Sequence, residues 1–273
     1  MEMTNEIKCL ARRIRRDVLK MTYQSGANGG HLGGALSSAD IFAVLYGSVL
    51  NIDPKQPNDP DRDRFILSKG HVALGHYATL AEAGFMTQEE LTTFEQSGSE
   101  ISTHEVMNQE KGIEVSGGSL GYGLSIGVGI ALNAKRKQRP YQTFVLLGDG
   151  ECNEGTVWEA AMSASRFQLN NLTAIVDMNG QSLDGYTRDV MPIANPTKVW
   201  EGFGWQVTET DGNDVECLLE AFCDPRDSRP RVILAHTKKG KGVATIEDQV
   251  GWHHARLNQE QYEQFVKELE SAE

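Results

Sequence analysis

Cysteine is scarce in this sequence, and its spacing suits neither a disulfide framework nor a zinc site. The chain of 273 residues has four cysteines, none in a Cys-x-x-Cys pair: Cys9, Cys152, Cys217 and Cys223. Disulfides persist in oxidising compartments, so this usage indicates reduced thiols inside a cell. No apolar run is long enough to cross a membrane and the amino terminus lacks a signal-peptide profile. We therefore expect a soluble, cytoplasmic protein without a membrane partner.

Positive charge is also in short supply along the chain. Lysine and arginine number 26 against 38 aspartates and glutamates, which gives a net charge of −12. Binding to nucleic-acid phosphates needs a basic face, so we expect no nucleic-acid partner. The chain also lacks repeats, low-complexity tracts and long linkers, and we expect a single domain over residues 1–273.

The apolar residues repeat with two different periods. Three- and four-residue steps predict helices over 5–24, 37–49, 71–83, 87–95, 119–135, 156–169 and 259–269. Short β-like runs predict strands over 64–67, 144–147, 172–176, 205–210 and 232–235. This alternation is typical of an α/β fold: a doubly wound, mainly parallel sheet with helices on both faces. We expect capping boxes at Ser37–Asp40 and Thr87–Glu90, and a solvated helix at the end of the chain.

The most informative stretch lies around residue 150. The strand 144–147 ends in Gly148-Asp149-Gly150, and the strand 172–176 ends in Asp177-Met178-Asn179. In a strand–helix–strand unit the carboxyl ends of the two strands meet, and open α/β sheets bind ligands at that edge. The oxygens of Asp149 and Asn179 suit a hard cation such as Mg²⁺, which completes its shell with water and phosphate. We infer a magnesium-diphosphate site.

The same tripeptide has a simpler interpretation. A lone Gly-Asp-Gly after a strand more often forms only a turn, because glycine allows positive φ and aspartate bonds its own backbone. The presence of Asn179 at the end of the next strand is what favours the ligand interpretation over the turn.

Four histidines lie in glycine-rich or polar loops. These are His31 in Gly29–Gly34, His71 after Ser68-Lys69-Gly70, His104 in Ser102–Glu105, and His253 after the basic glycine loop 238–242. Taken singly, each is more often a surface or packing residue than a catalytic one. They are too widely spaced for a zinc set, and the chain has no His-Glu-x-x-His. Imidazoles around an anionic cofactor and a polyhydroxylated substrate make better chemical sense.

The glycines at 121, 123 and 127 have a spacing close to a dinucleotide fingerprint. Their pattern is Gly-x-Gly-x-x-x-Gly and no apolar strand leads directly into it, so we reject NAD binding. Four-residue steps through Gly123, Gly127 and Ala131 leave one helix face bare, so a neighbour can pack closely. That neighbour is either internal or another subunit, and we favour a subunit interface.

Together these motifs resemble the amino-terminal, diphosphate-binding half of the transketolases. The Gly-Asp-Gly…Asn pattern over 148–179 is similar to the thiamine diphosphate motif, and Gly180–Gly185 is similar to the sequence that follows it in that family. Arg62–His71 resembles the family nearly letter for letter, and the likeness runs from about residue 8 to 257. The resemblance implies thiamine diphosphate with Mg²⁺, or with Ca²⁺ or Mn²⁺ in its place.

The resemblance also implies roles for individual residues. The metal ligands would be Asp149, Asn179 and the main-chain oxygen of Gln181. The cofactor would be held by His71, Gly118, Leu120, Gly150, Asn179 and His253, with Glu154 at the subunit contact near a glutamate from the partner. The catalytic residues, facing the sugar or relaying protons, would be His31, His71, His104 and His253.

The chain departs from the family pattern at several positions. Proline is usual at two places where this chain has Leu32 and Glu105. Threonine is usual at Gly117, glutamine at Tyr122, and an apolar residue at His76. These changes affect the expected substrate preference more than cofactor binding, because the metal and diphosphate positions are intact.

The activity implied is transfer of a two-carbon ketol unit from a ketose phosphate to an aldose phosphate, by covalent chemistry on the cofactor. Full transketolases continue into a pyrimidine-binding domain and a carboxy-terminal domain. The expected partner is therefore a separate C-terminal transketolase subunit, in a two-plus-two heterotetramer. The donor is either an ordinary sugar of the pentose phosphate pathway or a specialised ketose from another sugar catabolism.

Three other interpretations remain open from the sequence. The α chain of a 2-oxo-acid dehydrogenase shares the Gly-Asp-Gly motif but lacks the Ser-Lys-Gly-His and His-Leu-Gly-Gly loops. Deoxyxylulose-phosphate synthase has similar early loops but is normally one chain. The third is a cofactor-binding or regulatory subunit without activity of its own.

Overall fold

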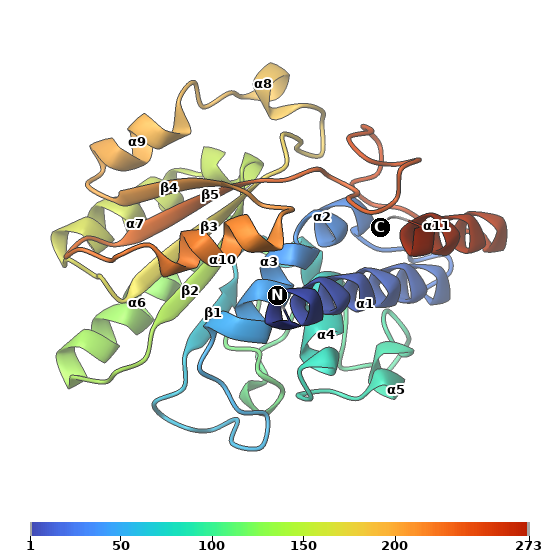
Figure 1. Cartoon of the computed structure of the whole chain (residues 1–273), viewed down its shortest axis with the longest axis horizontal. Helices are drawn as coiled ribbons and strands as arrows, with labels where there is room; N and C mark the ends of the chain where they lie inside the picture. Colours follow the sequence, from blue (N-terminus) through green and yellow to red (C-terminus); the bar gives the residue numbers. More distant parts are fainter. Residues whose placement is uncertain (1, 272–273) are drawn as a thin grey trace.

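A parallel five-stranded sheet lies at the centre of the computed structural model, which describes residues 2–271 (Figure 1). Its strands are β1 (Arg64–Leu67), β2 (Thr143–Gly148), β3 (Leu172–Met178), β4 (Gln206–Asp211) and β5 (Arg231–His236). Their order across the sheet is β1-β2-β3-β5-β4, and every neighbouring pair is parallel. The predicted strands are all present, with ends that differ by a residue or two.

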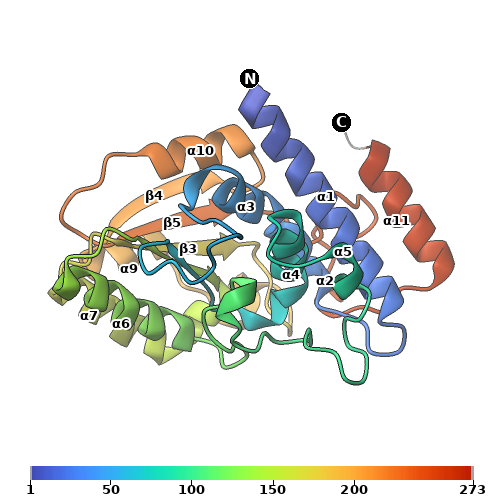
Figure 2. The ribbon, with the colours of Figure 1, turned by 90° about the horizontal axis from the view of Figure 1, so that it is seen from below.

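Helices cover both faces of this sheet (Figure 2). One face carries α1 (Glu2–Gln24), α2 (Leu32–Ser37), α3 (Ala39–Val44), α4 (Ala73–Glu82), α10 (Val215–Cys223) and α11 (Gln259–Ser271). The other carries α6 (Tyr122–Lys137), α7 (Gly155–Arg166) and α9 (Pro196–Gly202). Shorter helical turns are η1 (Leu45–Val49), η2 (Gly70–Val72), α5 (Gln88–Leu91), η3 (Gln109–Lys111), η4 (Gly150–Asn153) and α8 (Thr187–Val190). The predicted α/β, doubly wound fold is confirmed.

Alternation along each strand divides the apolar interior into two cores. In β2, Phe144 and Leu146 pack with α1, α3 and α10, whereas Val145 and Leu147 pack with α6, α7 and α9. Successive side chains of a strand point to opposite faces, so a sheet covered on both faces needs continuous apolar strands. The uninterrupted apolar run in β2 meets that requirement.

The small-residue face of α6 packs against the sheet, so the subunit interface favoured from the sequence is wrong for this face. A Cβ at Gly127 would lie 2.6 Å from Cγ2 of Val145, and one at Gly123 would lie 2.4 Å from the Ser68 side chain. Ala131 is fully buried. The absent side chains let α6 approach β1 and β2 closely, and the opposite side of the helix faces outward.

Of the two predicted capping boxes, one is confirmed and one is wrong. At Thr87 and Glu90 each side chain accepts a hydrogen bond from the other's main-chain N–H, at the start of α5. Ser37 instead lies inside α2, and Asp40 forms a buried ion pair with Arg15. Tertiary pairing outweighs the local cap at this position.

The last helix, α11, lies beside α1 (Figure 1) rather than standing alone in solvent. The rings of Tyr262 and Tyr23 stack with centroids 4.6 Å apart, and Phe265 and Leu269 are buried. The expectation of a solvated end piece is therefore wrong. The buried contacts fasten this helix to the rest of the fold.

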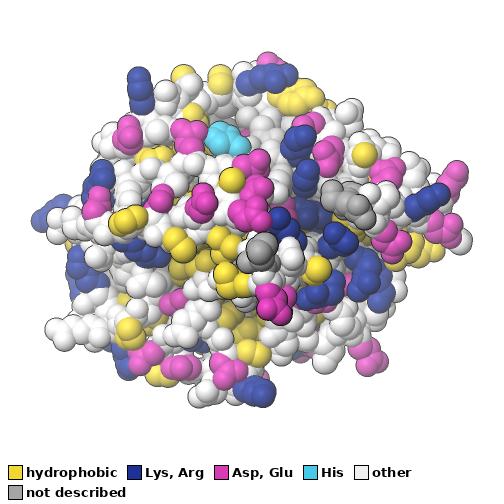
Figure 3. Space-filling model, in the orientation of Figure 1, with side chains coloured by type: hydrophobic (Ala, Val, Ile, Leu, Met, Phe, Trp, Pro, Cys, Tyr) yellow, Lys and Arg dark blue, Asp and Glu magenta, His cyan; other side chains and the backbone are white. Residues whose placement is uncertain are grey.

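Charges of both signs are interspersed on the surface seen in Figure 3. That face is therefore mixed in charge rather than uniformly basic. Among the helices of residues 2–271, none combines the length and the apolar character that crossing a membrane requires.

Candidate active site

A cavity of about 310 Å³ opens where β2 and β3 end. Gly148 and Asp177 are register partners at these ends, so the residues that follow each strand lie side by side. Most of the predicted site residues line the cavity, namely His71, His104, Gly118, Leu120, Asp149, Gly150, Asn179, Gln181 and His253. The parallel pairing brings together segments that lie far apart in the sequence.

Asp149 is a partly buried carboxylate whose hydrogen bonds within residues 2–271 come from main-chain and hydroxyl groups. The main-chain N–H of Gly150 donates to Oδ1 at 2.9 Å, and that of Gly180 donates to Oδ2 at 2.8 Å. Burial, and then the nearby Asp177, raise the pKa of Asp149 to about 6. A cation bound at this carboxylate would offset both effects, because it would restore the interactions that water provides to an ionised acid.

The neighbouring groups fit a hard cation. Within the described residues no three His, Cys, Asp or Glu side chains converge to hold a metal, so amide and main-chain oxygens would have to contribute. Nδ2 of Asn179 donates to Asp177 at 2.8 Å, so Oδ1, which accepts from the Gln181 N–H at 3.1 Å, is the atom that could also coordinate a metal. Nε2 of Gln181 is buried without a hydrogen-bond partner among these residues. One carboxylate, one amide oxygen and one carbonyl oxygen suit Mg²⁺ completed by water and phosphate.

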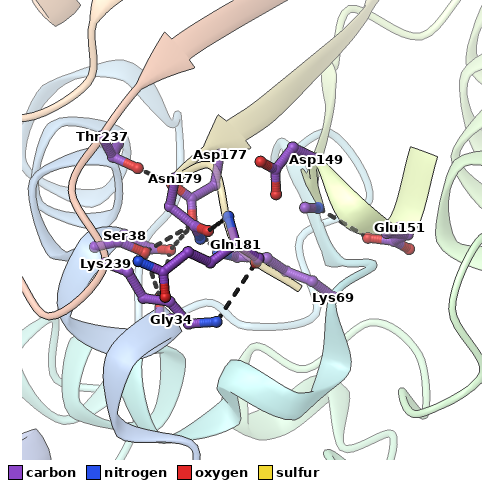
Figure 4. A network of polar contacts seen from close by, with 12 residues as sticks. Gly34, Ser38, Lys69, Asp149, Glu151, Asp177, Asn179, Gln181, Thr237 and Lys239 are labelled. Atoms are coloured by element: carbon purple, nitrogen blue, oxygen red, sulfur yellow. Dashed lines mark hydrogen bonds and ion pairs between the residues drawn. The ribbon is translucent and has the colours of Figure 1, made fainter. Parts of the chain in front are cut away.

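Beneath the cavity lies an ion pair between Lys69 and Asp177 that the sequence analysis did not single out (Figure 4). Both side chains are almost fully buried. Ser37 and Thr237 donate hydroxyl hydrogen bonds to the same carboxylate. Burial acts to raise the pKa of Asp177, but Lys69 and the hydroxyl donors lower it below its ordinary value. The ion pair and its two hydroxyl donors join four segments of the chain, beneath the proposed metal ligands.

Replacing Lys69 by Met should destabilise the fold strongly, because it leaves the Asp177 carboxylate buried without its counter-charge. Breaking a buried ion pair from one side costs about 3–5 kcal/mol of unfolding free energy. We expect urea unfolding of Lys69→Met at pH 7 to show a loss of that size. The exposed pair of Lys8 and Glu216 supplies the control. Lys8→Met should leave the unfolding midpoint unchanged, and equal stability of Lys69→Met and wild type would contradict the assigned role.

The four predicted catalytic histidines approach one another from four separate loops. The ring centroid of His31 lies 5.4 Å from that of His71, 5.3 Å from His253 and 6.0 Å from His104. His254, to which the sequence analysis gave no role, lies 4.8 Å from His31. His31 is therefore at the centre of an imidazole cluster, although it does not line the cavity directly.

Three of these imidazoles are uncharged at neutral pH. Burial, followed by His253, lowers the pKa of His31 to about 3. Burial and Lys69 lower the pKa of His71 to about 2, and burial and Lys239 lower that of His253 to about 4. A neutral ring offers one donor and one acceptor nitrogen, so each can bind a hydroxyl group or transfer a proton.

Lys239 brings positive charge to the opposite wall. Its Nζ lies 3.1 Å from Nδ1 of His253 and 3.4 Å from the main-chain oxygens of Gln181 and Ser182. Burial, and then Lys69, lower the pKa of Lys239 to about 8, so it remains mostly protonated at pH 7. An ammonium at this place suits an anionic ligand such as a diphosphate. The basic loop 238–242 is visible in the sequence, but no local pattern there indicates a role for Lys239.

Two of the histidine-bearing loops are fastened to each other by main-chain pairing. Gly30 and Ala255 form an antiparallel bridge with two N–H···O bonds of 2.9 Å. At Gly29 φ is +68°, and a Cβ there would lie 2.3 Å from the oxygen of Ala255, so only glycine fits. The bridge fixes the separation of His31 and His253.

Two glutamates follow the Gly-Asp-Gly turn, one inside the fold and one outside. Glu151 is buried and accepts hydrogen bonds from the main-chain N–H groups of Gly121 (2.8 Å) and Gly148 (3.0 Å) and from Ser68. It thus ties three loops of the cavity together, a role absent from the sequence analysis. Glu154 is exposed before α7 and does not line the cavity. Its predicted place at a subunit contact stays a prediction.

Comparisons with known proteins agree with this geometry. The family model described as "Transketolase, thiamine diphosphate binding domain" matches residues 8–271. An apulose-4-phosphate transketolase subunit of Phocaeicola vulgatus is 39% identical over 257 residues, which cover 93% of this chain and 90% of the relative. A 6-deoxy-6-sulfo-D-fructose transketolase subunit of a Clostridium species is 38% identical over 243 residues, 88% of each chain.

Among solved structures, transketolase from Campylobacter jejuni superposes with a TM-score of 0.87 at 28% identity. The match covers 99% of this chain but 43% of that one, so the chain spans about two fifths of the solved enzyme. The family match and the subunit relatives favour the transketolase interpretation over the other thiamine enzymes weighed from the sequence. This chain belongs to the transketolase family of transferases, as a thiamine diphosphate-binding subunit.

Proposed function

We propose that this chain, as one domain over residues 1–273, binds thiamine diphosphate and Mg²⁺ in the cytoplasm and transfers a ketol unit between sugar phosphates. The observation that carries the proposal is the meeting of two features in one cavity. The Asp149 corner suits a metal-bound diphosphate, and the neutral histidines next to it suit a polyhydroxylated substrate. Neither feature alone distinguishes this chemistry.

The diphosphate of the cofactor would lie between the proposed metal ligands and Lys239. Asp149, Asn179 and the oxygen of Gln181 would hold the metal, while His71 and the N–H of Gly150 would donate to phosphate oxygens. The main chain at Gly118 and Leu120, on the same cavity wall, would contact the aminopyrimidine ring. When bound, the cofactor supplies the carbanion chemistry that breaks and forms the carbon–carbon bond.

The imidazoles of this chain would orient the sugar and move protons. His31 and His253 are neutral and adjacent. Nδ1 of His253 accepts from Lys239, so its Nε2 carries the proton and would donate to a substrate hydroxyl, whereas Nδ1 of His31, unpartnered within residues 2–271, would be free to accept from one. His104 is exposed at the cavity wall and would be the first of the four to meet a sugar. Lys239, 3.1 Å from His253, would favour the neutral form of that ring during turnover.

Two ketose classes are candidates for the donor. The relatives compared above are named for apulose 4-phosphate and for 6-deoxy-6-sulfo-D-fructose, both specialised sugars. Their likeness over most of both chains supports a specialised ketose ahead of an ordinary sugar of the pentose phosphate pathway. Glu105 and Gly117 are the chain neighbours of the cavity residues His104 and Gly118, and His76 contacts Glu105 from the core, which supports the same choice.

A second polypeptide would complete the active site. The relative from Phocaeicola vulgatus is named as one subunit of a transketolase, and the match covers nine tenths of its length. We therefore propose that the partner is a C-terminal transketolase subunit, in a two-plus-two heterotetramer with closed two-fold symmetry. The exposed side of α6, with Tyr122 and Ile126, and the exposed Glu154 are the surfaces proposed for this contact.

The test is ketol transfer by the purified chain with Mg²⁺ and thiamine diphosphate, with and without the product of the neighbouring transketolase gene. We expect transfer from apulose 4-phosphate, 6-deoxy-6-sulfo-D-fructose or xylulose 5-phosphate only when both chains are present. Robust transfer by this chain alone would refute the two-chain proposal. Pyruvate consumption, or decarboxylation of a 2-oxo acid with a lipoyl acceptor, would instead point to the rival thiamine enzymes.

A further inference from the structure

Two of the positions at which the sequence departs from the transketolase pattern contact each other in the core. Nδ1 of His76 lies 2.5 Å from a carboxylate oxygen of Glu105, and Nε2 lies 2.6 Å from the hydroxyl of Tyr46. His76 is 1% exposed and Glu105 is 3% exposed, so water does not reach the pair. The imidazole is also stacked on Phe42, with ring centroids 5.8 Å apart.

Both ring nitrogens of His76 have a hydrogen-bonding partner. A carboxylate can only accept, so Nδ1–H of His76 donates to Glu105, while the Tyr46 hydroxyl pairs with Nε2. A buried imidazole requires such a partner at each nitrogen. An apolar side chain at position 76 would leave the carboxylate buried without a donor, so residues 76 and 105 depend on each other.

Glu105 also connects this pair to the cavity. Its neighbour in sequence is His104, and its main-chain oxygen accepts a hydrogen bond from Gly117 N–H at 2.9 Å. A Cβ on Gly118 would lie 3.5 Å from the His104 ring, so these two cavity residues are close neighbours. Residue Glu105 is therefore held at both ends. His76 binds its carboxylate, and its main-chain oxygen joins the loop of His104 to the loop of Gly118.

We propose that His76 and Tyr46 are positioning residues, which hold Glu105 and thereby set the place of His104 in the cavity. The proposal rests on the function proposed above, in which His104 faces the sugar. In this chain a buried series of hydrogen bonds takes the place of the proline that the family has at position 105. The hydrogen bonds of His76 lie behind the part of the cavity wall that would face the sugar. We therefore expect them to affect the use of the ketose donor and not the binding of the cofactor.

The test is the variant His76→Leu in the complex of this chain with its partner, with xylulose 5-phosphate and the two specialised ketoses as donors. We expect kcat/KM for the preferred donor to fall about 10- to 100-fold, the range for a displaced substrate-positioning group. The affinity for thiamine diphosphate with Mg²⁺ should stay within about twofold, since no cofactor contact is removed. The control is His236→Leu, which removes an exposed histidine paired with Glu209, and it should leave both quantities unchanged.

A rescue experiment distinguishes a positioning role of His76 from general damage to the fold. The double variant His76→Leu/Glu105→Pro restores the usual family residues and removes the stranded carboxylate, so it should recover kcat/KM to within about threefold of wild type. Should His76→Leu fail to fold, Tyr46→Phe removes one hydroxyl and should lower kcat/KM in the same direction. Unchanged kcat/KM in the folded variants, or an equal loss of cofactor affinity, would overturn the proposal.

A second readout needs no activity. Hydrogen exchange of the isolated chain should show faster exchange at Gly117 N–H in His76→Leu than in wild type, and wild-type exchange in His236→Leu. If the wild-type complex transfers no ketol unit, the proposed function fails, and the exchange result still decides the positioning role. Equal exchange at Gly117 in His76→Leu and wild type would contradict it.

Discussion

Asp149→Asn should abolish Mg²⁺-dependent binding of thiamine diphosphate while leaving the fold intact. The substitution keeps the shape of the side chain and one of its two main-chain hydrogen bonds, to Gly150 or to Gly180, but it removes the one carboxylate assigned to the metal. The cation would then face only neutral oxygens beside a charged diphosphate. Calorimetry with both ligands should show a loss of at least about 100-fold in affinity, in line with the loss of a charged ligand.

The control for this variant is Asp61→Asn, at an exposed carboxylate paired with Arg139. It should bind the cofactor as wild type does. Cofactor affinity within about threefold of wild type in Asp149→Asn would remove this residue from the metal site. The unfolding midpoint of both variants distinguishes a lost ligand from a lost fold.

The raised pKa of Asp149 also gives the binding a pH dependence of known sign. In the free chain the carboxyl titrates at about pH 6, because burial and then Asp177 raise its pKa. The metal binds the ionised form, so binding releases a proton below that pH. Mg²⁺ affinity should therefore fall by about tenfold per pH unit below about pH 6 and level off above it, as far as about pH 7.5. A flat profile down to about pH 5 would contradict the assignment.

His253→Ala and His31→Ala should each lower turnover by roughly 10²–10⁴, the range for loss of a positioned proton-transfer group. The rings lie 5.3 Å apart and have pKa values of about 4 and about 3, so both are neutral at working pH. The loss should appear in kcat with the partner present. The affinity for thiamine diphosphate should fall less in His31→Ala, since that ring does not line the cavity.

His236→Ala is the matched control for the histidine variants, because this ring is exposed and paired with Glu209 away from the cavity. Turnover within a few-fold of wild type in His31→Ala and His253→Ala would make both residues structural. Rescue of His253→Ala by added imidazole would support proton transfer over packing.

Much of the cavity could be predicted because its residues stand at the ends of strands. Asp149 and Asn179 each follow an apolar run, and the rule that adjacent parallel strands end together places them at one edge without further information. The histidines were harder to place, since nothing local says that four loops meet. They could be grouped only because each belongs to a motif that the chain shares with transketolases.

The remaining features depend on tertiary contacts that no local pattern encodes. Lys69 and Asp177 are 108 positions apart and are brought together by the pairing of β1 with β2 and of β2 with β3. His76 and Glu105 were noted one by one as departures from a family pattern, but their partnership is visible only in the fold. On α6 the small residues did predict close packing, yet the pattern is the same for a sheet as for a second subunit.

The strand order carries a consequence for biosynthesis. β4 pairs with β5 alone, and β5 is inserted between β4 and β3 although it comes later in the sequence. While the ribosome is making the chain, residues 206–211 therefore have no strand to pair with until residues 231–236 have emerged. During that interval an unpaired edge is available to other nascent chains. Strand β5 closes the described sheet, and the loops that carry Lys239 and His253 follow it directly, so the cavity is complete only after residue 253 has been made.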